Sequence, residues 1–285
     1  MSIAQLRREY HQRICQEIIR LHQDGETTYP NLADKGSKTS RAIAQRLVKR
    51  LGFPLGSPRV SGQSAGRLFE AATRDFLETA FDLLRHLRPG NWYYSTQSPI
   101  SKFDQYEHLA DLEKIVRENG ELASALGRDY IITPDIVIGR WPVSDEEINQ
   151  TEIVIKADES CARFTPLREV NSQSARPILH ASVSCKWTIR SDRVQNSRTE
   201  ALNLIRNRKG HTPHIVAVTA EPLPTRIASL ALGTGDLDCV YHFALPELQE
   251  AIAEIDNEDQ MEMLTMLVEG RRLRDISDLP FDLAI

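Results

Sequence analysis

Apolar residues recur every three or four positions in two long segments of the chain, and this is the spacing of an amphipathic helix. In residues 3–23 the stripe consists of Ile3, Leu6, Tyr10, Ile14, Ile18 and Leu21. In residues 67–87 it consists of Phe69, Ala72, Phe76, Ala80, Leu83, Leu84 and Leu87. The sequence also predicts helices over 41–51, 109–126 and 197–207, and C-terminal helices from Pro246 to about Ile276.

Short apolar runs bounded by turn residues predict buried strands between these helices. The runs cover 130–138, 179–187, 214–219 and 239–245, and a shorter one covers 152–155 within an otherwise irregular 142–178. Strands that alternate with helices indicate an α/β sheet covered on both faces. Because no linker or repeat divides the chain, we expect one domain over 1–285. It would comprise a mainly helical part (1–60), a core (61–245) and C-terminal helices (246–285).

The run Leu-His-Ala-Ser-Val-Ser-Cys-Lys-Trp (179–187) has an unusual pattern for a buried strand. Side chains alternate between the faces of a sheet, so one face would carry His180, Ser182, Ser184 and Lys186. Ala181, Val183, Cys185 and Trp187 would take the other face. A polar face on a buried strand predicts that the strand borders a cleft.

Two of the predicted strands each contain a charged residue. Asp135 follows Pro134 in the first strand, and Lys186 ends the polar face of the second. An acid and a lysine on adjacent strands can hold Mg²⁺ beside a scissile phosphate in a nuclease. The simpler alternative is a structural ion pair at the strand ends.

Two glutamates extend this set. Glu200 lies in the predicted helix 197–207, where Ser197 and Glu200 also fit a capping box, and Glu70 lies on the flank of the stripe of 67–87, as a rim carboxylate would. With them, Asp135 and the main-chain carbonyl of Cys185 could bind one or two Mg²⁺, and Lys186 could orient and help deprotonate a water. The absence of a His or Cys cluster favours Mg²⁺ over zinc.

Bulk composition limits the cellular setting. The 285 residues are 41% hydrophobic and 26% charged, as in an ordinary globular protein. No apolar stretch approaches the ~20 residues of a membrane helix, and charges at Arg7, Arg8 and Glu9 predict that no signal peptide is present. The four cysteines lack paired or metal-ligand spacing and indicate free thiols in the cytoplasm.

Charge is unevenly distributed along the chain. The net charge is -5, yet residues 186–209 carry seven cations and two anions. Such a local excess fits DNA binding at one surface, because attraction to phosphates is local. A solvated helix face is the alternative explanation.

The tetrapeptide Arg190-Ser-Asp-Arg193 follows the predicted catalytic strand directly. Arginine pairs bidentately with guanine and a carboxylate accepts from cytosine, so Arg190, Asp192 and Arg193 suit a site made only of G·C pairs. In isolation the same residues could form a turn closed by a salt bridge.

Longer motifs carry a family resemblance. They are His-Ala-Ser-Val-Ser-Cys-Lys-Trp-Thr-Ile-Arg-Ser-Asp-Arg (180–193), Arg-Asn-Arg-Lys-Gly (206–210), Leu-Gly-Thr-Gly (232–235), Tyr-His-Phe-Ala-Leu (241–245), Ile-Ser-Asp-Leu-Pro (276–280) and the run from Leu126-Gly127 to Asp135. Over nearly its whole length the chain closely resembles the NgoMIV family of type II restriction endonucleases, within the wider Cfr10I/Bse634I group.

This resemblance implies a restriction-endonuclease-like PD-(D/E)XK fold, a central mixed β-sheet flanked by helices. Ser184 occupies the place of the usual acidic residue, whose role the resemblance gives to Glu200, with Glu70, Asp135 and Lys186 also catalytic. The matching recognition residues are Arg190, Asp192 and Arg193 for the central CCGG, Gln63 for the minor groove, and Asp34 and Arg226 for the outer base pair.

The resemblance further implies Mg²⁺-dependent cleavage of GCCGGC after the first G, with four-base 5′ overhangs. It implies a homotetramer that engages two DNA sites, with a cognate methyltransferase as a separate protein. The chain departs from the family at Lys35, which looks inserted, in a shorter 93–106, and in 142–175. Two alternatives from other classes are a DNA-binding regulator on a decayed nuclease fold and a repair nuclease that recognises DNA shape.

Overall fold

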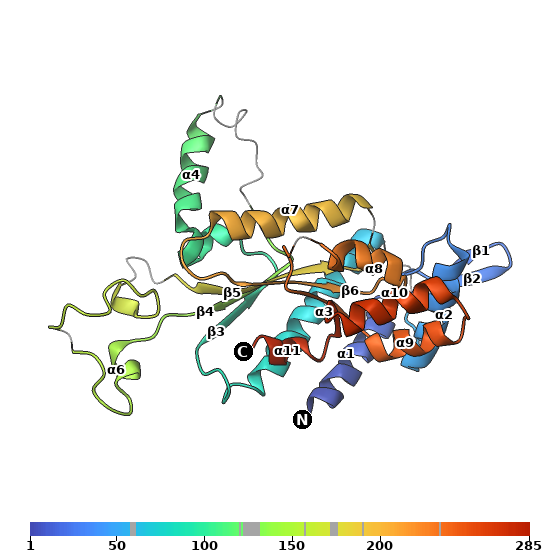
Figure 1. Ribbon diagram of the computed structural model, residues 1–285, viewed down its shortest axis with the longest axis horizontal. Helices are drawn as coiled ribbons and strands as arrows, with labels where there is room; N and C mark the ends of the chain where they lie inside the picture. The colour runs from blue at the N-terminus through green and yellow to red at the C-terminus, as the bar shows by residue number, and fades with distance from the viewer. Residues whose placement is uncertain are drawn as a thin grey trace.

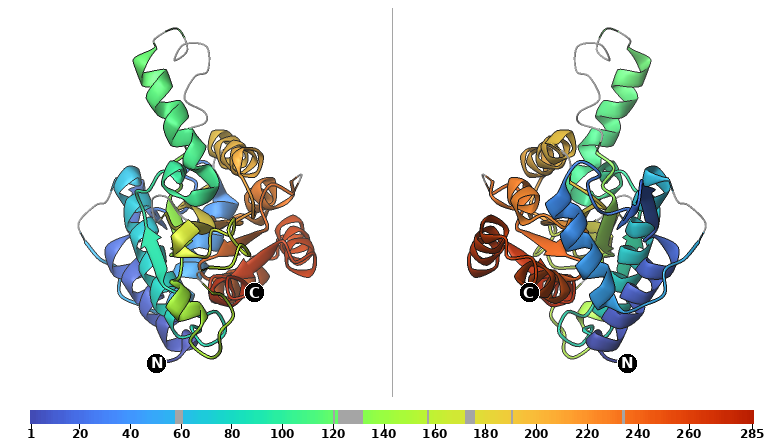
Figure 2. Two further views of the ribbon diagram at one scale, coloured as in Figure 1. Left: turned by 90° about the vertical axis from the view of Figure 1, so that its left-hand side faces the viewer. Right: turned by 90° about the vertical axis from the view of Figure 1, so that its right-hand side faces the viewer.

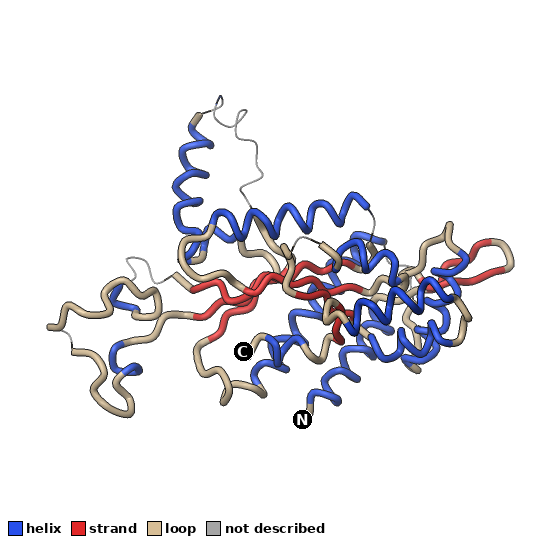
Figure 3. Tube along the Cα trace, viewed as in Figure 1, coloured by secondary structure: helices blue, strands red, loops and turns tan. Residues whose placement is uncertain are grey.

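The computed structural model describes residues 1–57, 61–119, 121, 132–156, 158–171, 176–189, 191–233 and 235–285. Its centre is a six-stranded sheet in the order β3-β4-β5-β6-β7-β8 (Figure 1, Figure 3). The strands span Trp92–Ser95, Ile136–Arg140, Ile178–Lys186, His214–Thr219, Cys239–His242 and Leu273–Asp275, in that order.

The sheet is mixed. The pairs β3–β4 and β4–β5 are antiparallel, whereas β5–β6, β6–β7 and β7–β8 are parallel. Parallel neighbours require crossover connections. These are α7 (Ser191–Asn207) after β5, α8 (Pro224–Ala231) after β6, and α9 (Leu245–Ala253) with α10 (Glu258–Glu269) after β7. The predicted α/β sheet flanked by helices is confirmed.

Helices cover both faces of the sheet (Figure 2). On one face lie α3 (Gly62–Asp82), α1 (Ile3–Glu17) and α11 (Leu279–Asp282); on the other lie α7 and α8. Helix α2 (Lys38–Leu51) packs against α9. Helix α4 (Glu107–Glu118) projects from the body, and α6 (Asp145–Ile148) lies in a second excursion (Figure 1). Short 3₁₀ turns span Ile100–Lys102, Asp104–Tyr106 and Glu169–Asn171.

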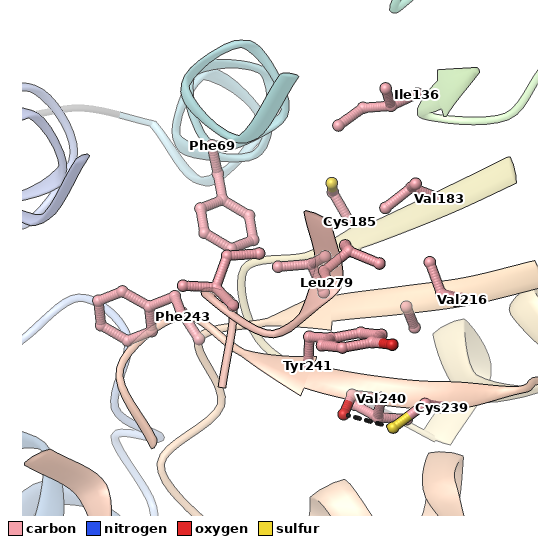
Figure 4. Close-up of a cluster of buried hydrophobic side chains, with 14 of the residues drawn as sticks. Phe69, Ile136, Val183, Cys185, Val216, Cys239, Val240, Tyr241, Phe243 and Leu279 are labelled. Carbon is pink, nitrogen blue, oxygen red and sulfur yellow. Dashed lines mark hydrogen bonds between the residues drawn. The ribbon is translucent and has the colours of Figure 1, made fainter. Parts of the chain in front are cut away.

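One connected hydrophobic cluster joins the helices to the sheet. Phe69 points from α3 toward the sheet near Cys185 and Leu279 (Figure 4), and its ring meets Trp187 edge-on with centroids 5.3 Å apart. Burying one such side chain contributes about 1.5–3 kcal/mol. The strand that carries the candidate lysine is therefore held from the α3 side by apolar packing. None of the described helices is long and apolar enough to cross a membrane.

The N-terminal helix is shorter than the apolar stripe predicts. Helix α1 ends at Glu17, and a hairpin of β1 (Leu21–Asp24) and β2 (Thr27–Pro30) follows. The side chain of Asn31 accepts from the Arg20 amide at 3.1 Å and donates to the carbonyl of Ile18 at 2.9 Å, so it replaces the next helical turn. Gly25, with φ of 62°, supplies the left-handed turn between the strands.

Other predicted boundaries were also wrong. Residues 152–155 form no strand, because the amides of Val154 and Ile155 bond to the Asn149 side chain at 2.8 and 3.0 Å instead of to a neighbouring strand. The predicted C-terminal helices end at Glu269, and β8 follows them. Strand β3 and helix α8 were not predicted at all; both are short, spanning only four and eight residues.

Candidate active site

The ends of β4 and β5 bring Asp135 and Lys186 together. Asp135 lies within the predicted strand 130–138, but β4 begins one residue later, at Ile136, so Asp135 immediately precedes the strand. Residues 130 and 131 of the predicted run lie outside the described part. Ile136 pairs with Val183, so one step back along β4 places Asp135 beside Ser184. Lys186 Nζ donates to Asp135 Oδ2 at 3.0 Å, as the sequence predicted for neighbouring strands.

Asp135 Oδ2 has two further contacts with β5. The Cys185 amide donates to it at 2.7 Å, and the Ser184 hydroxyl lies 3.4 Å away. On the opposite edge of β5, the Lys186 carbonyl accepts from Thr219 Oγ1 at 2.8 Å. Successive residues of a strand direct their backbone groups to opposite edges. The Cys185 carbonyl therefore faces the β4 side, where Asp135 lies.

Glu70 approaches this pair from α3. Its neighbour Phe69 is fully buried against the sheet, and Glu70 is half-buried on the flank of the same helix. Burial, followed by the charge of Asp135, raises the pKa of Glu70 to about 7, although the charge of Lys186 opposes this shift. Glu70 therefore shares an electrostatic environment with both strand-end residues.

Glu200 approaches from α7, on the opposite face. Burial raises the pKa of Glu200, as does the charge of Asp135, while the charge of Lys186 lowers it. The capping-box interpretation was wrong, because α7 begins at Ser191 and Ser197 lies inside the helix. Ser197 is 2% exposed, and its hydroxyl lies 3.3 Å from that of Ser184.

Lys186 is a cation in this arrangement. Burial alone lowers the pKa of its ammonium, but the charge and hydrogen bond of Asp135 and the charge of Glu200 outweigh burial and raise it. A group whose pKa is raised in this way is poorly suited to accept a proton. Its positive charge and its N–H donors are the features available for chemistry.

The polar face predicted for β5 is only partly correct. The β4–β5 register skips His180, since Ile138 pairs with Ala181 and Gly139 with Leu179. This bulge turns His180 toward the face of α3 and α11, where Nε2 donates to the Leu283 carbonyl at 2.8 Å. Ser184 faces α7 instead. The simple alternation of side chains therefore holds only beyond the bulge.

The predicted outer-base residues meet in a groove of about 940 Å³. Arg226, in the first turn of α8, pairs with Asp34 from the loop after β2. Ile189 and Arg198 also line this groove. It adjoins the segment that follows β5, so the Asp34–Arg226 pair and the active-site strand lie in one continuous region.

The other predicted recognition residues are only partly described. Gln63 is exposed and lies in the first turn of α3, not in a loop before the helix. Arg190 lies outside the described residues. Asp192 and Arg193 belong to the first turn of α7, and their side chains also lie outside the described part. The structure therefore gives no contacts for the Arg-X-Asp-Arg element.

Whether the site can bind a metal ion depends on the donor atoms that its residues offer. Within the described ranges, no three His, Cys, Asp or Glu side chains gather closely enough to form a metal site by themselves. Mg²⁺, however, uses one or two carboxylates and keeps several waters. Asp135 and the Cys185 carbonyl provide such hard oxygens, and the mutual repulsion of Asp135 with Glu70 and Glu200 would be relieved by a cation.

Sequence reasoning missed three residues that support the site. Thr219 links β6 to the Lys186 carbonyl, Ser197 contacts Ser184, and Glu221 is a buried acid, 1% exposed, just beyond β6. A pattern in the sequence could have identified Glu221. It is a charged residue in an apolar, proline-rich run directly after a predicted strand, as Asp135 is a charged residue after a proline within one.

The known proteins that resemble this chain are type II restriction endonucleases, enzymes that cleave DNA at specific sites. Residues 10–285 match the family model described as NgoMIV restriction enzyme. Over 258 residues the chain is 49% identical to the type II restriction enzyme NgoMIV of Neisseria gonorrhoeae, and the match covers 89% of each chain. The chain therefore belongs to the NgoMIV restriction enzyme family, which confirms the resemblance carried by its motifs.

Solved structures give weaker matches. The Bse634I endonuclease with cognate DNA has a TM-score of 0.34 and 12% identity, covering 96% of this chain and 99% of that one. The PspGI endonuclease–substrate DNA complex has a TM-score of 0.25 and 12% identity, covering 93% and 97%. The family assignment rests on the sequence matches.

Proposed function

We propose that this restriction endonuclease hydrolyses double-stranded DNA at a palindrome of G·C pairs containing CCGG. The proposed site is GCCGGC, cut after the first G to leave four-base 5′ overhangs, with two Mg²⁺ per active site. The observation that carries the catalytic part is the contact of Asp135 with Lys186 at the strand ends, with Glu70 and Glu200 approaching from opposite faces of the sheet.

Asp135 and the Cys185 carbonyl would hold the metal, and Glu70 and Glu200 would complete its surroundings directly or through water. When bound, Mg²⁺ supplies Lewis-acid stabilisation to the phosphate and to the leaving 3′ oxygen. Ser184 takes the position of the usual acid and holds Asp135 in place through its hydroxyl.

Lys186 acts through its charge in this proposal. The charges of Asp135 and Glu200 raise the pKa of this ammonium, so it presents a positive charge and N–H donors to the site. We therefore assign Lys186 to orienting the attacking water and to stabilising the negative charge that develops on the phosphate. Its position 3.0 Å from Asp135 keeps the ammonium beside the proposed metal site.

Base recognition is assigned to two groups of residues. Arg190, Asp192 and Arg193 would contact the central CCGG in the major groove, since arginine pairs with guanine and aspartate with cytosine. Asp34 and Arg226 would contact the outer base pair, and their position in one groove beside Ile189 supports this division. Gln63 would reach the minor groove from the exposed start of α3.

We also propose a homotetramer of two dimers that binds two DNA sites. The excursion after β4 exposes Ile153, Val154, Phe164 and Val170, and Phe164 is 99% exposed. Exposed apolar side chains on a protruding segment favour burial against another subunit. Light scattering after size-exclusion chromatography measures the assembly; a monomer or a single dimer would contradict it. We place the enzyme in the cytoplasm, with its methyltransferase as a separate protein.

Run-off sequencing of plasmid DNA digested with Mg²⁺ tests the proposed activity. We expect cuts only at GCCGGC, each after the first G, and none with excess EDTA. Cuts at other sequences would contradict the proposed site. Tight binding without any cleavage would instead favour a DNA-binding regulator, and cleavage without a preferred sequence would favour a repair nuclease that recognises shape.

A further inference from the structure

Glu221 is a buried carboxylate that takes no part in the proposed chemistry. It lies two residues beyond β6 in the run Thr-Ala-Glu-Pro-Leu-Pro (219–224) and is 1% exposed. Its Oε2 accepts from the Ile189 amide at 2.9 Å, in a distant segment, and its Oε1 accepts from the Leu223 amide at 3.2 Å, two residues further along its own segment. One carboxylate thus holds two backbones in a fixed relation.

These two backbones carry the proposed recognition residues. Ile189 directly precedes Arg190, the first of the residues assigned to the central base pairs. Leu223 is the N-cap of α8, whose first turn carries Arg226. The guanidinium of Arg226 lies 4.0 Å from Glu221 Oε1 and also pairs with Asp34. Arg226 therefore lies between the buried carboxylate and the residue with which it would contact the outer base pair.

The same corner is attached to the catalytic strand. Thr219 Oγ1 donates to the Lys186 carbonyl at 2.8 Å and accepts from the Glu221 amide at 3.1 Å. Burial raises the pKa of the Glu221 carboxyl to about 7, while the bonds from Ile189 and Leu223 and the charge of Arg226 oppose that rise. Burial is unfavourable for a charged carboxylate. The two amides and the guanidinium that contact Glu221 compensate for that burial.

We propose that Glu221 is a positioning residue for sequence specificity. It sets the spacing between Ile189, the residue before the proposed central-base contacts, and the Asp34–Arg226 pair, so that central and outer base pairs are contacted in one register. Glu221 itself need not touch DNA. The inference rests on the proposed function, because it assumes that these two groups of residues contact bases.

The variant Glu221→Gln tests the proposal with little change in side-chain shape. The amide can accept from only one of the two backbones, and its NH₂ group would face the other donor. The matched control is Asp238→Asn, since Asp238 also accepts a backbone amide at the edge of β6, from Ile215 at 2.9 Å, but lies at the opposite end of that strand. If Glu221→Gln does not fold, Glu221→Asp, which keeps the charge but is shorter, takes its place.

Two duplexes are compared, the sequence that the wild-type enzyme is found to prefer and the same sequence with only its outer base pair changed. For each protein we measure kcat/KM on both, and the ratio of binding affinities by fluorescence anisotropy. We expect Glu221→Gln to lose about tenfold or more of the discrimination, the loss of one good base contact, while Asp238→Asn keeps the wild-type ratio. A loss of folded protein alone would lower both values equally and leave their ratio unchanged.

A Glu221→Gln enzyme that folds and keeps the wild-type ratio in both measurements would overturn the proposal. Equal loss of discrimination in Asp238→Asn would overturn it too, because the effect would then not be particular to Glu221. An error in the GCCGGC assignment appears separately, in the sequences of the ends that the wild-type enzyme produces.

Discussion

Asp135 Oδ2 lies 3.0 Å from Lys186 Nζ, although 51 positions separate the two residues in the chain. The contact results from the antiparallel register of β4 and β5, which places the start of one strand beside the end of the other. The side chains of Lys186 and Asp135 are 18% and 27% exposed. The pair is therefore shielded by the protein and still accessible to a substrate at the edge of the sheet.

Replacing either member of this pair should abolish cleavage. We expect Asp135→Ala and Lys186→Ala to reduce kcat by roughly 10³-fold or more, because each removes a charge aimed at the reacting phosphate. DNA binding should persist, since neither residue is among the proposed recognition residues. Cleavage rates and anisotropy binding measure the two effects. The control Asp75→Asn removes an ion pair between α3 and α1, with Arg13 at 2.7 Å. Wild-type turnover in either the Asp135 or the Lys186 variant would refute the assigned roles.

The two helix glutamates should matter for catalysis more than for stability. Because burial and Asp135 disfavour the ionised forms of Glu70 and Glu200, we expect Glu70→Gln and Glu200→Gln to leave the melting temperature unchanged or raised. Cleavage should fall at least about tenfold, and the Mg²⁺ concentration for half-maximal rate should rise. A rate and a Mg²⁺ dependence equal to wild type would exclude that residue from the active site.

The packing of Phe69 should support both fold and site. Phe69 is fully buried against Trp187, so Phe69→Ala should lower the free energy of unfolding by about 3–5 kcal/mol through lost contacts and a cavity. Leu83→Ala, at a residue that is 37% exposed, is the control and should cost under about 1 kcal/mol. Urea unfolding measures both, and similar losses for the two variants would show that α3 packs differently.

Stability should fall with acid because of His180. Burial, with the nearby charges of Arg88 and His214, lowers the pKa of His180 to about 3, although its bond to the Leu283 carbonyl opposes this. The unfolded chain therefore binds a proton that the folded chain does not, so this contribution is complete above about pH 6.5 and is lost as pH falls toward 3.

Urea unfolding of wild type and His180→Gln at pH 7.5 and 5.5 isolates this effect. The fall in stability between the two pH values should be smaller in the variant by about 1.4 kcal/mol, the value of one pH unit. Other titrating groups contribute equally to both proteins and cancel in the difference. An identical pH dependence would show that His180 is not held neutral in the folded state.

The sequence by itself determined the class of fold and named most of the proposed active-site residues. Strand β6 was recognisable from a continuous apolar run and β5 from its alternating pattern, and both were predicted within a residue. A charged residue within a predicted strand marked Asp135 and Lys186. The family was recognisable because its motifs are long and specific. These patterns involve residues that are close together in the sequence, so they can be recognised without knowledge of the fold.

The tertiary structure decided which groups meet. The bulge at His180, the early start of α7 and the hairpin after α1 arise from pairing and packing with distant segments, so no local pattern specifies them. The same holds for Glu221, whose two partners, Ile189 and Leu223, lie on either side of it in the sequence and 34 positions apart. Sequence supplies the acids and the lysine, whereas strand register and helix packing set the distances at which they act.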